Sequence, residues 1–175
     1  RAIAEKSGAV IYDAPDVLTL TGGFAEARNI LFSHIPANVE WVMWIDTDDV
    51  FCADRNLHAV VDEIPANLSG IALPYAYFRD EYGNLTTVFD RERVIRMACE
   101  PFWVGPLHEI CQVRKGGEWG RPYGDPKDAP CWVEHKNRKE ESEKGTRNFA
   151  LLWKWLEQEP DNSRVHWYLG MQYFA

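Results

Sequence analysis

Three carboxylates lie within four residues at Asp46-Thr47-Asp48-Asp49, directly after the apolar run Trp41–Ile45. Carboxylates this close repel one another unless a cation lies among them. Oxygen ligands suit Mg²⁺ or Mn²⁺, and such an ion also neutralises the charge that develops on a departing diphosphate. The segment therefore indicates either a divalent metal site or a solvated acidic turn that follows a strand.

A second group of reactive side chains lies between Trp103 and Glu109, where a bulky aromatic residue and a tight turn precede the pair His108-Glu109. A carboxylate partly enclosed by aromatic surface is suited to act as a general base. Glu109 is therefore a candidate base, with His108 beside it. The same residues are also compatible with a strand end that carries a surface histidine and glutamate.

Two isolated side chains complete the candidates. His135 follows the acids much later in the chain and is placed to complete a metal shell, although a lone histidine is more often structural. Arg28 lies on a helix that follows a double glycine, where it can reach a phosphate. The alternative for Arg28 is an exposed ion pair with Glu26 or Asp13.

The elements that position these residues follow from the apolar pattern. Trp41–Ile45 does not alternate, which predicts a strand covered on both faces, as in a parallel sheet with helices on each side. The acids then follow at the end of that strand, and the carboxyl ends of strands are where open α/β sheets bind ligands. Further strands are predicted over 9–12, 70–78, 85–89 and 132–135, with a turn at 80–84 and a loop over 115–130.

Helices are predicted over 2–6, 24–34 and 57–64, the first ended by Gly8 and the third by Pro65. The residues expected on the buried face of the second helix are Ala27, Ile30, Leu31 and His34.

From Ser142, a possible N-cap, the chain becomes helical. Its apolar face is expected to hold Phe149, Leu152, Trp153 and Leu156. Pro160 ends this helix, and a second one carries Val165, Tyr168 and Leu169. The segment Leu169–Tyr173 matches part of the tetratricopeptide repeat pattern.

Composition limits the classes of function. The chain has 175 residues, a formal net charge of −8, 46% hydrophobic residues and 26% charged residues, which is typical of one globular domain with a short appendage. The acidic balance without a Lys/Arg stripe argues against binding nucleic acid. No apolar run approaches the ~18–20 residues that span a bilayer, so no membrane span is expected.

The four cysteines include no C-x-x-C pair. In a chain with room for a core they need not form disulfides. Buried, reduced thiols and a cytoplasmic location are therefore expected.

The ordered motifs resemble those of family 2 glycosyltransferases. The resemblance to the family rests on Arg1-x-Ile3-Ala4-Glu5-Lys6-x-Gly8-Ala9, Phe24-x-x-Ala27-Arg28-Asn29 and Trp44-Ile45-Asp46-x-Asp48-Asp49. Later in the chain come Trp103-x-Gly105-x-x-His108-Glu109, His135, Lys144-x-x-Arg147-Asn148 and the helix after Pro160-Asp161. These later motifs are similar to a bacterial and phage-type branch of the family, in which the catalytic domain runs into tetratricopeptide repeats. The fold that this implies is an α/β GT-A (Rossmann-like) mixed sheet with flanking helices over residues 1–140, followed by a C-terminal helical extension over 141–175.

The resemblance also implies a hexosyl-type transferase that inverts the anomeric carbon and uses a nucleotide-diphosphate-sugar donor such as a UDP-sugar. Mn²⁺ or Mg²⁺ would be held by Asp48 with Asp46 and His135, and Asp46 would also contact the ribose or sugar of the donor. Glu109 would be the catalytic base. Arg28, Trp103 and His108 would bind substrate, and the acceptor would be a protein or a polysaccharide.

One departure from the family pattern affects this expectation. The first strand and an Asp-x-x-Ser-x-Asp-like segment that hold the nucleotide are not found, so the chain resembles an N-terminally truncated member and is expected to bind donor poorly. A non-catalytic module that docks a protein through its C-terminal helices is the alternative. Metal-dependent phosphodiester hydrolysis ranks last, because the sequence offers no tight His/Asp cluster.

Overall fold

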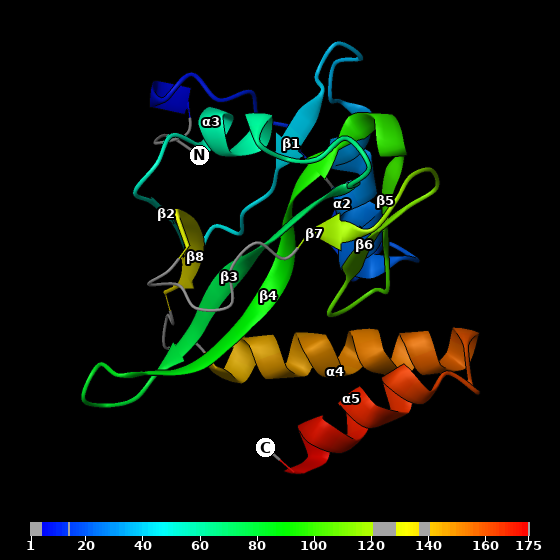
Figure 1. Ribbon diagram of the computed structural model, residues 1–175. Helices are drawn as coiled ribbons and strands as arrows, with labels where there is room; N and C mark the ends of the chain where they lie inside the picture. The colour runs from blue at the N-terminus through cyan, green and yellow to red at the C-terminus, as the bar shows by residue number, and fades with distance from the viewer. Residues whose placement is uncertain (1–4, 14, 121–128, 137–140, 175) are drawn as a thin grey trace. The chain divides into compact units, whose positions relative to one another are not determined.

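The computed structural model describes residues 5–13, 15–120, 129–136 and 141–174 and is a mixed α/β fold (Figure 1). Its contacts divide the chain into two compact units. Unit 1 holds Arg1–Pro36, Phe102–Ile110 and Glu140–Ala175, and unit 2 holds Ala37–Pro101 and Cys111–Lys139. Each unit is therefore assembled from segments that are distant in sequence. The division at residue 140 expected from the resemblance remains a prediction.

Unit 2 is built on a mixed sheet with the strand order β1-β4-β3-β8-β2. Strands β3 and β8 run parallel, β7 also pairs parallel with β3, and the other pairs are antiparallel. The elements of this unit are β1 (Trp41–Met43), β2 (Asp49–Ala53), α3 (Leu57–Asp62), β3 (Gly70–Arg79), β4 (Leu85–Arg96), the 3₁₀ turn η1 (Met97–Cys99), β7 (Trp119–Gly120) and β8 (Cys131–His135).

Local sequence explains the two best-defined features of unit 2. The Asn56 side chain accepts a hydrogen bond from the backbone N–H of His58 and so caps α3. The β3–β4 hairpin turns at residues 80–84, where the Asp80 carboxylate accepts from the N–H groups of Tyr82 and Asn84. Gly83 supplies the positive φ of +85° that this turn requires.

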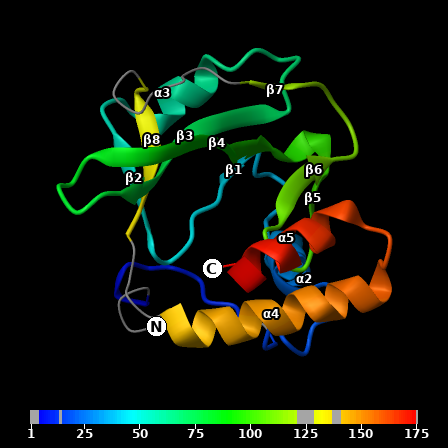
Figure 2. The same cartoon turned by 90° about the horizontal axis from the view of Figure 1, so that it is seen from below.

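The core of unit 2 lies between α3 and one face of the sheet. Figure 2 shows α3 lying over β3 and β4. Its fully buried members are Val60, Ile71, Leu73, Val94 and Cys131. Residues 70–76 of β3 are all buried, whereas the strand becomes exposed toward the hairpin turn. A near-continuous apolar run is typical of a strand that is covered on both faces.

Unit 1 holds α2 (Gly23–Ser33), α4 (Glu141–Gln158), α5 (Ser163–Phe174) and most of β5 (Pro101–Val104). Strand β5 forms a two-stranded sheet with β6 (Ile110–Val113), of which only Ile110 belongs to unit 1. Helices α4 and α5 pack against each other as a hairpin. Their buried residues form a core with Leu107, and Phe24 of α2 packs against it; the helix residues are Leu151, Leu152, Trp155, Val165 and Leu169.

Several sequence predictions are confirmed. The 70–78 and 85–89 strands are β3 and β4, although β4 continues to Arg96, and 132–135 is β8. The helices at 57–64 and from 142 onward are α3, α4 and α5, with Val165 and Leu169 buried. Glu5 and Lys6 are helical, and Gly8 follows with a φ of +75°. The predicted cap Ser142 and part of the 115–130 loop lie outside the described residues.

Other predictions are wrong for identifiable reasons. Residues 9–12 form no strand. The apolar run Trp41–Ile45 is a strand only to Met43, and β1 pairs antiparallel with β4 at one end of the described sheet order. In α2 the expected Leu31 is 52% exposed, because the helix packs through Phe24 and Ala25 instead. In α4 the face that packs into the core includes Leu151 and Trp155. Trp153 therefore lies on the exposed side of the helix.

None of the four cysteines forms a disulfide; Cys99, Cys111 and Cys131 are buried and Cys52 is partly buried. Within the described residues, no helix combines the length and the apolar character that crossing a bilayer would need.

Candidate functional site

Strand pairing in unit 2 brings the acidic segment next to the predicted histidine. Asp49 begins β2, His135 ends β8, and the two residues are directly opposite each other in the antiparallel register. One ligand atom from each of Asp48, Asp49 and His135 lies within 4.8 Å of the others. The structure therefore places the predicted ligands Asp48 and His135 together, and it adds Asp49 to them.

Backbone hydrogen bonds hold the acidic turn in this position. The N–H of Asp49 donates to the carbonyl of Asp46 at 3.1 Å, which closes the turn before β2. The N–H of Lys136 donates to the carbonyl of Asp48 at 2.7 Å, which ties the turn to the end of β8. The spacing of Asp48 and His135 is thus set by two strands and not by a free loop.

Asp49 is the centre of a buried polar network. Its side chain has no exposed surface, and its Oδ2 lies 2.9 Å from Nη2 of Arg93. Its Oδ1 accepts a hydrogen bond from the Tyr75 hydroxyl at 2.7 Å and lies 3.1 Å from Nδ1 of His135. An ionised carboxylate in this position is stabilised by one guanidinium and by hydrogen bonds.

Arg93 reaches this carboxylate because of a bulge in β4. Ile71 pairs with Val94 and Ala72 pairs with Glu92, so Arg93, which lies between Glu92 and Val94, has no residue opposite it in β3. A bulge of this kind redirects a side chain. Here the guanidinium lies over two aromatic rings, 3.8 Å from the centroid of Trp44 and 4.6 Å from that of Tyr75.

Burial moves two pKa values in this network. Desolvation lowers the pKa of Arg93, and the charge of Asp49 opposes that change. Burial raises the pKa of Tyr75 well above its ordinary value, and the hydrogen bond to Asp49 acts in the same direction. Tyr75 therefore stays neutral and donates its proton, while Arg93 supplies the positive charge.

Aromatic packing restrains the His135 ring as well. Tyr77 stacks on it with centroids 5.1 Å apart and an interplanar angle of 16°. Tyr77 follows Tyr75 and Ala76, which pair with Val133 and Glu134 of β8. The parallel β3–β8 pairing thus places Tyr75 against both Asp49 and His135, and Tyr77 against the His135 ring.

Asp46 is not among the three grouped ligands within the described residues. Its charge contributes to raising the pKa of Tyr75, after burial and Asp49. Its expected contacts with a cation and with the donor remain predictions.

The remaining predicted site residues lie in unit 1. Arg28 Nε lies 2.6 Å from Oε1 of Glu109, and both side chains are largely buried. The Arg28 guanidinium also lies 4.8 Å from the ring centroid of Trp103. Arg28, Trp103 and Glu109 thus form one cluster. One acidic partner of Arg28 is Glu109, which the sequence did not suggest.

Asn29 is hydrogen-bonded to Trp103 of this cluster, whereas His108 packs against α5. The Asn29 amide donates to the carbonyl of Trp103 and accepts from its N–H, at 3.0 and 2.8 Å. His108 is exposed, has a φ of +52°, and stacks on Tyr168 at a centroid distance of 4.1 Å. The expected role of Glu109 as a base facing the acids joins two units and remains a prediction.

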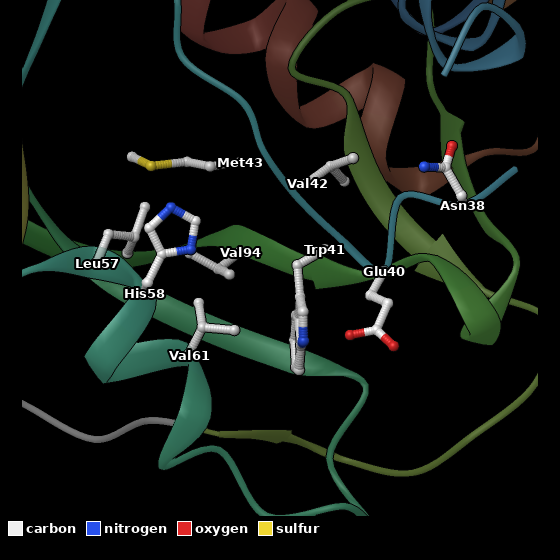
Figure 3. A pocket seen from close by; sticks show the side chains of 9 residues that line it. All are labelled: Asn38, Glu40, Trp41, Val42, Met43, Leu57, His58, Val61 and Val94. Carbon is white, nitrogen blue, oxygen red and sulfur yellow. The ribbon is translucent and has the colours of Figure 1, made fainter. Parts of the chain in front are cut away.

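A pocket of about 400 Å³ lies elsewhere in unit 2, between β1 and α3. Figure 3 shows Trp41 and Met43 of β1 with Leu57, His58 and Val61 of α3 around it. Neither Asp48, Asp49 nor His135 lines this pocket. Its walls are mainly apolar, which does not suit a diphosphate.

Sequence reasoning missed the roles of Trp44, Tyr75 and Arg93. One signal was present: Arg91-Glu92-Arg93 interrupts a strand whose following residues, Val94 and Ile95, are apolar. A buried arginine needs a carboxylate partner, and the acidic turn is a suitable source. The bulge that selects Arg93 over Arg91 has no such signal.

No protein-family model matches the chain, and a search of the curated proteins finds no significant match. The similarity to family 2 glycosyltransferases therefore depends on the ordered motifs alone.

Proposed function

We propose that the chain is an inverting glycosyltransferase of family 2, or a part of one, with a GT-A fold and a divalent cation at Asp48 and His135. The observation that carries the proposal is the convergence of these two side chains, which lie on separate strands and far apart in sequence. The mixed α/β sheet is compatible with GT-A, and the α4–α5 hairpin with the start of a tetratricopeptide repeat.

The residues present suit such an ion. Asp48 offers a carboxylate oxygen and His135 an imidazole nitrogen, a donor set that Mn²⁺ accepts readily and Mg²⁺ less so. When bound, the cation neutralises the negative charge of a UDP leaving group. Asp46, in the same turn, is proposed to contact the ribose or sugar of the donor.

In the proposed reaction an acceptor hydroxyl attacks the anomeric carbon of the sugar. The bond from that carbon to the diphosphate oxygen breaks, its electron pair stays with the diphosphate, and the hydroxyl proton passes to Glu109. Arg28 holds the Glu109 carboxylate in one orientation, since it donates from Nε at 2.6 Å. Arg28, Trp103 and His108 are proposed to contact substrate. We place the reaction in the cytoplasm, with a protein or polysaccharide acceptor.

A thermal-shift series with Mn²⁺, with and without UDP, tests the cation site. At about 100-fold above the Kd, a ligand that binds only the folded state adds about 2.7 kcal/mol, or roughly 5–10 °C in melting temperature for a chain of this size. Asp48→Asn is expected to abolish the Mn²⁺ shift. Asp62→Asn is the matched control, because Asp62 is an exposed residue of α3 and the charge change is identical.

Turnover tests the base. UDP release from a panel of UDP-sugars is expected to fall by about 10²–10⁴-fold in Glu109→Gln, while the Mn²⁺ shift is retained. Equal Mn²⁺ shifts in wild type, Asp48→Asn and Asp62→Asn would remove the support for a cation at this site.

One observation favours the alternative of a protein-docking module. The helical hairpin exposes several large apolar side chains: Trp153, Trp167, Met171 and Tyr173. On that alternative neither Mn²⁺ nor UDP changes the melting temperature, and Asp48→Asn behaves like Asp62→Asn. The same series therefore separates the two functions.

A further inference from the structure

We propose that Asp49 is a positioning residue: it holds His135 in the tautomer with the proton on Nδ1, so that the lone pair of Nε2 is presented to the cation. The part of this inference that concerns the cation rests on the proposed function. The part that concerns the tautomer is a property of the protein alone.

The first argument concerns the two oxygens of Asp49. Oδ2 is paired with Arg93 and Oδ1 accepts from Tyr75, and the side chain has no exposed surface. A cation that used Asp49 as a strong ligand would bring a second positive charge against the buried Arg93, or displace it. Either change leaves a buried charge poorly compensated, which is strongly unfavourable. Asp48, by contrast, is only partly buried.

The second argument concerns where the protons are. Asp49 Oδ1, the Tyr75 hydroxyl and His135 Nδ1 form a triangle with separations of 2.7, 3.1 and 3.1 Å. Both oxygens of Asp49 act as acceptors, Oδ2 toward Arg93 and Oδ1 toward Tyr75, so the one hydroxyl proton of Tyr75 points at Oδ1. Without a proton on Nδ1, its lone pair would face that of Oδ1 at 3.1 Å. With a proton on Nδ1, the contact becomes a hydrogen bond to an anion.

The consequence follows from the chemistry of imidazole. A neutral ring with its proton on Nδ1 has a lone pair only on Nε2. A carboxylate that receives the other ring N–H orients metal-binding histidines and raises their basicity, and its loss typically costs about 10–100-fold in metal affinity. Stacking on Tyr77 restrains the same ring from one face. Asp49 thus acts on the cation through His135.

Nitrogen-15 NMR of the imidazole rings tests the tautomer in the metal-free protein. Spectra are recorded at about pH 8, above the ordinary pKa of histidine, and the His135 signals are assigned by comparison with His135→Gln. We expect Nδ1 to give the shift of a protonated nitrogen and Nε2 that of an unprotonated one. The opposite pattern, or an even mixture of both tautomers, would overturn the proposal.

Asp49→Asn tests the cause with almost no change in shape. The amide oxygen is expected to face Arg93, which needs an acceptor, so the amide NH₂ faces His135 and Nδ1 becomes the acceptor. The proton then moves to Nε2, and Mn²⁺ affinity falls by about 10–100-fold. Asp62→Asn is again the control and should leave both the tautomer and the affinity unchanged. An unchanged tautomer in folded Asp49→Asn would overturn the proposal.

Two provisions keep the test decisive. If Asp49→Asn does not fold, Tyr75→Phe is used instead, because it keeps the Asp49 carboxylate and should retain the proton on Nδ1 of His135. Loss of that tautomer in Tyr75→Phe would show that Tyr75 holds the ring, and would overturn the proposal. If wild type binds no Mn²⁺ but shows the Nδ1–H tautomer, and Asp49→Asn reverses it, the proposed function fails while the positioning role of Asp49 stands.

Discussion

Arg93 and Asp49 form an ion pair in unit 2 with Nη2 and Oδ2 2.9 Å apart and neither side chain exposed. Arg93→Met should destabilise the protein by about 3–5 kcal/mol, because removing one member of a buried pair leaves the other charge uncompensated. Urea denaturation monitored by tryptophan fluorescence measures the change. The lost contact with the Trp44 ring adds to it.

Arg79→Met is the matched control for this prediction. Arg79 pairs with Glu134 at 3.2 Å, but its side chain is 44% exposed. Exposed pairs contribute less than about 1 kcal/mol, so the free energy of unfolding should change little. A loss of equal size in both variants would contradict the special role of the buried pair.

Tyr75 should make the protein sensitive to alkali. Burial raises its pKa in the folded state, whereas the unfolded chain releases that proton near pH 10. Above about pH 10 the unfolded state therefore binds fewer protons, and the stability contributed by Tyr75 falls by up to about 1.4 kcal/mol per pH unit. Below that pH the contribution is fully present.

Urea midpoints measured from about pH 9 to pH 11 isolate this effect. The difference in free energy of unfolding between wild type and Tyr75→Phe should shrink as the pH rises. Tyr82→Phe serves as the control, since Tyr82 is 81% exposed. A wild-type and Tyr75→Phe difference that stays constant over the range would show that Tyr75 is not protected from deprotonation.

The sequence predicts the elements of this protein better than their pairing. Alternation, caps and turn residues are local signals, and they suffice for β8, α3 and the β3–β4 hairpin. The run Trp41–Ile45 is misleading because its apolar character has two causes. Trp41 and Met43 pack against the core beside α3. Trp44 lies beyond the end of β1, and its ring packs against the Arg93 guanidinium instead.

The candidate site shows the same limit. Asp48 and His135 were predicted as ligands of one cation from the order of motifs, and the β2–β8 register places them together. The network behind them could not be predicted, because it depends on a bulge at Arg93 and on the parallel β3–β8 register. Both are decided by tertiary pairing and leave no local pattern.

In unit 1 the Arg28–Glu109 pair should show strong coupling in a double-mutant cycle. Arg28→Met leaves the buried Glu109 carboxylate without this partner and should cost about 3–5 kcal/mol. Adding Glu109→Gln removes the charge and should recover part of that loss, a coupling of about 1–3 kcal/mol. Urea denaturation of the four proteins gives the value. Additive effects would indicate that the two side chains are independent.

The turn that leads to Glu109 depends on a close approach to α2. Gly23 has a φ of +55°, and a Cβ added to it would lie 2.5 Å from the carbonyl oxygen of Pro106. That carbonyl accepts the N–H of Phe24 at 2.9 Å, so it cannot move away without losing the hydrogen bond. Gly23→Ala combines an unfavourable backbone conformation with a backbone clash and should cost more than about 2 kcal/mol.

Gly145→Ala is the control: a Cβ there meets nothing within 4 Å in α4, and it should stabilise the helix by about 0.5–1 kcal/mol. Thermal unfolding of both variants, with opposite signs expected, tests whether this contact fixes the Glu109 turn; equal stabilisation by the two alanines would show that it does not.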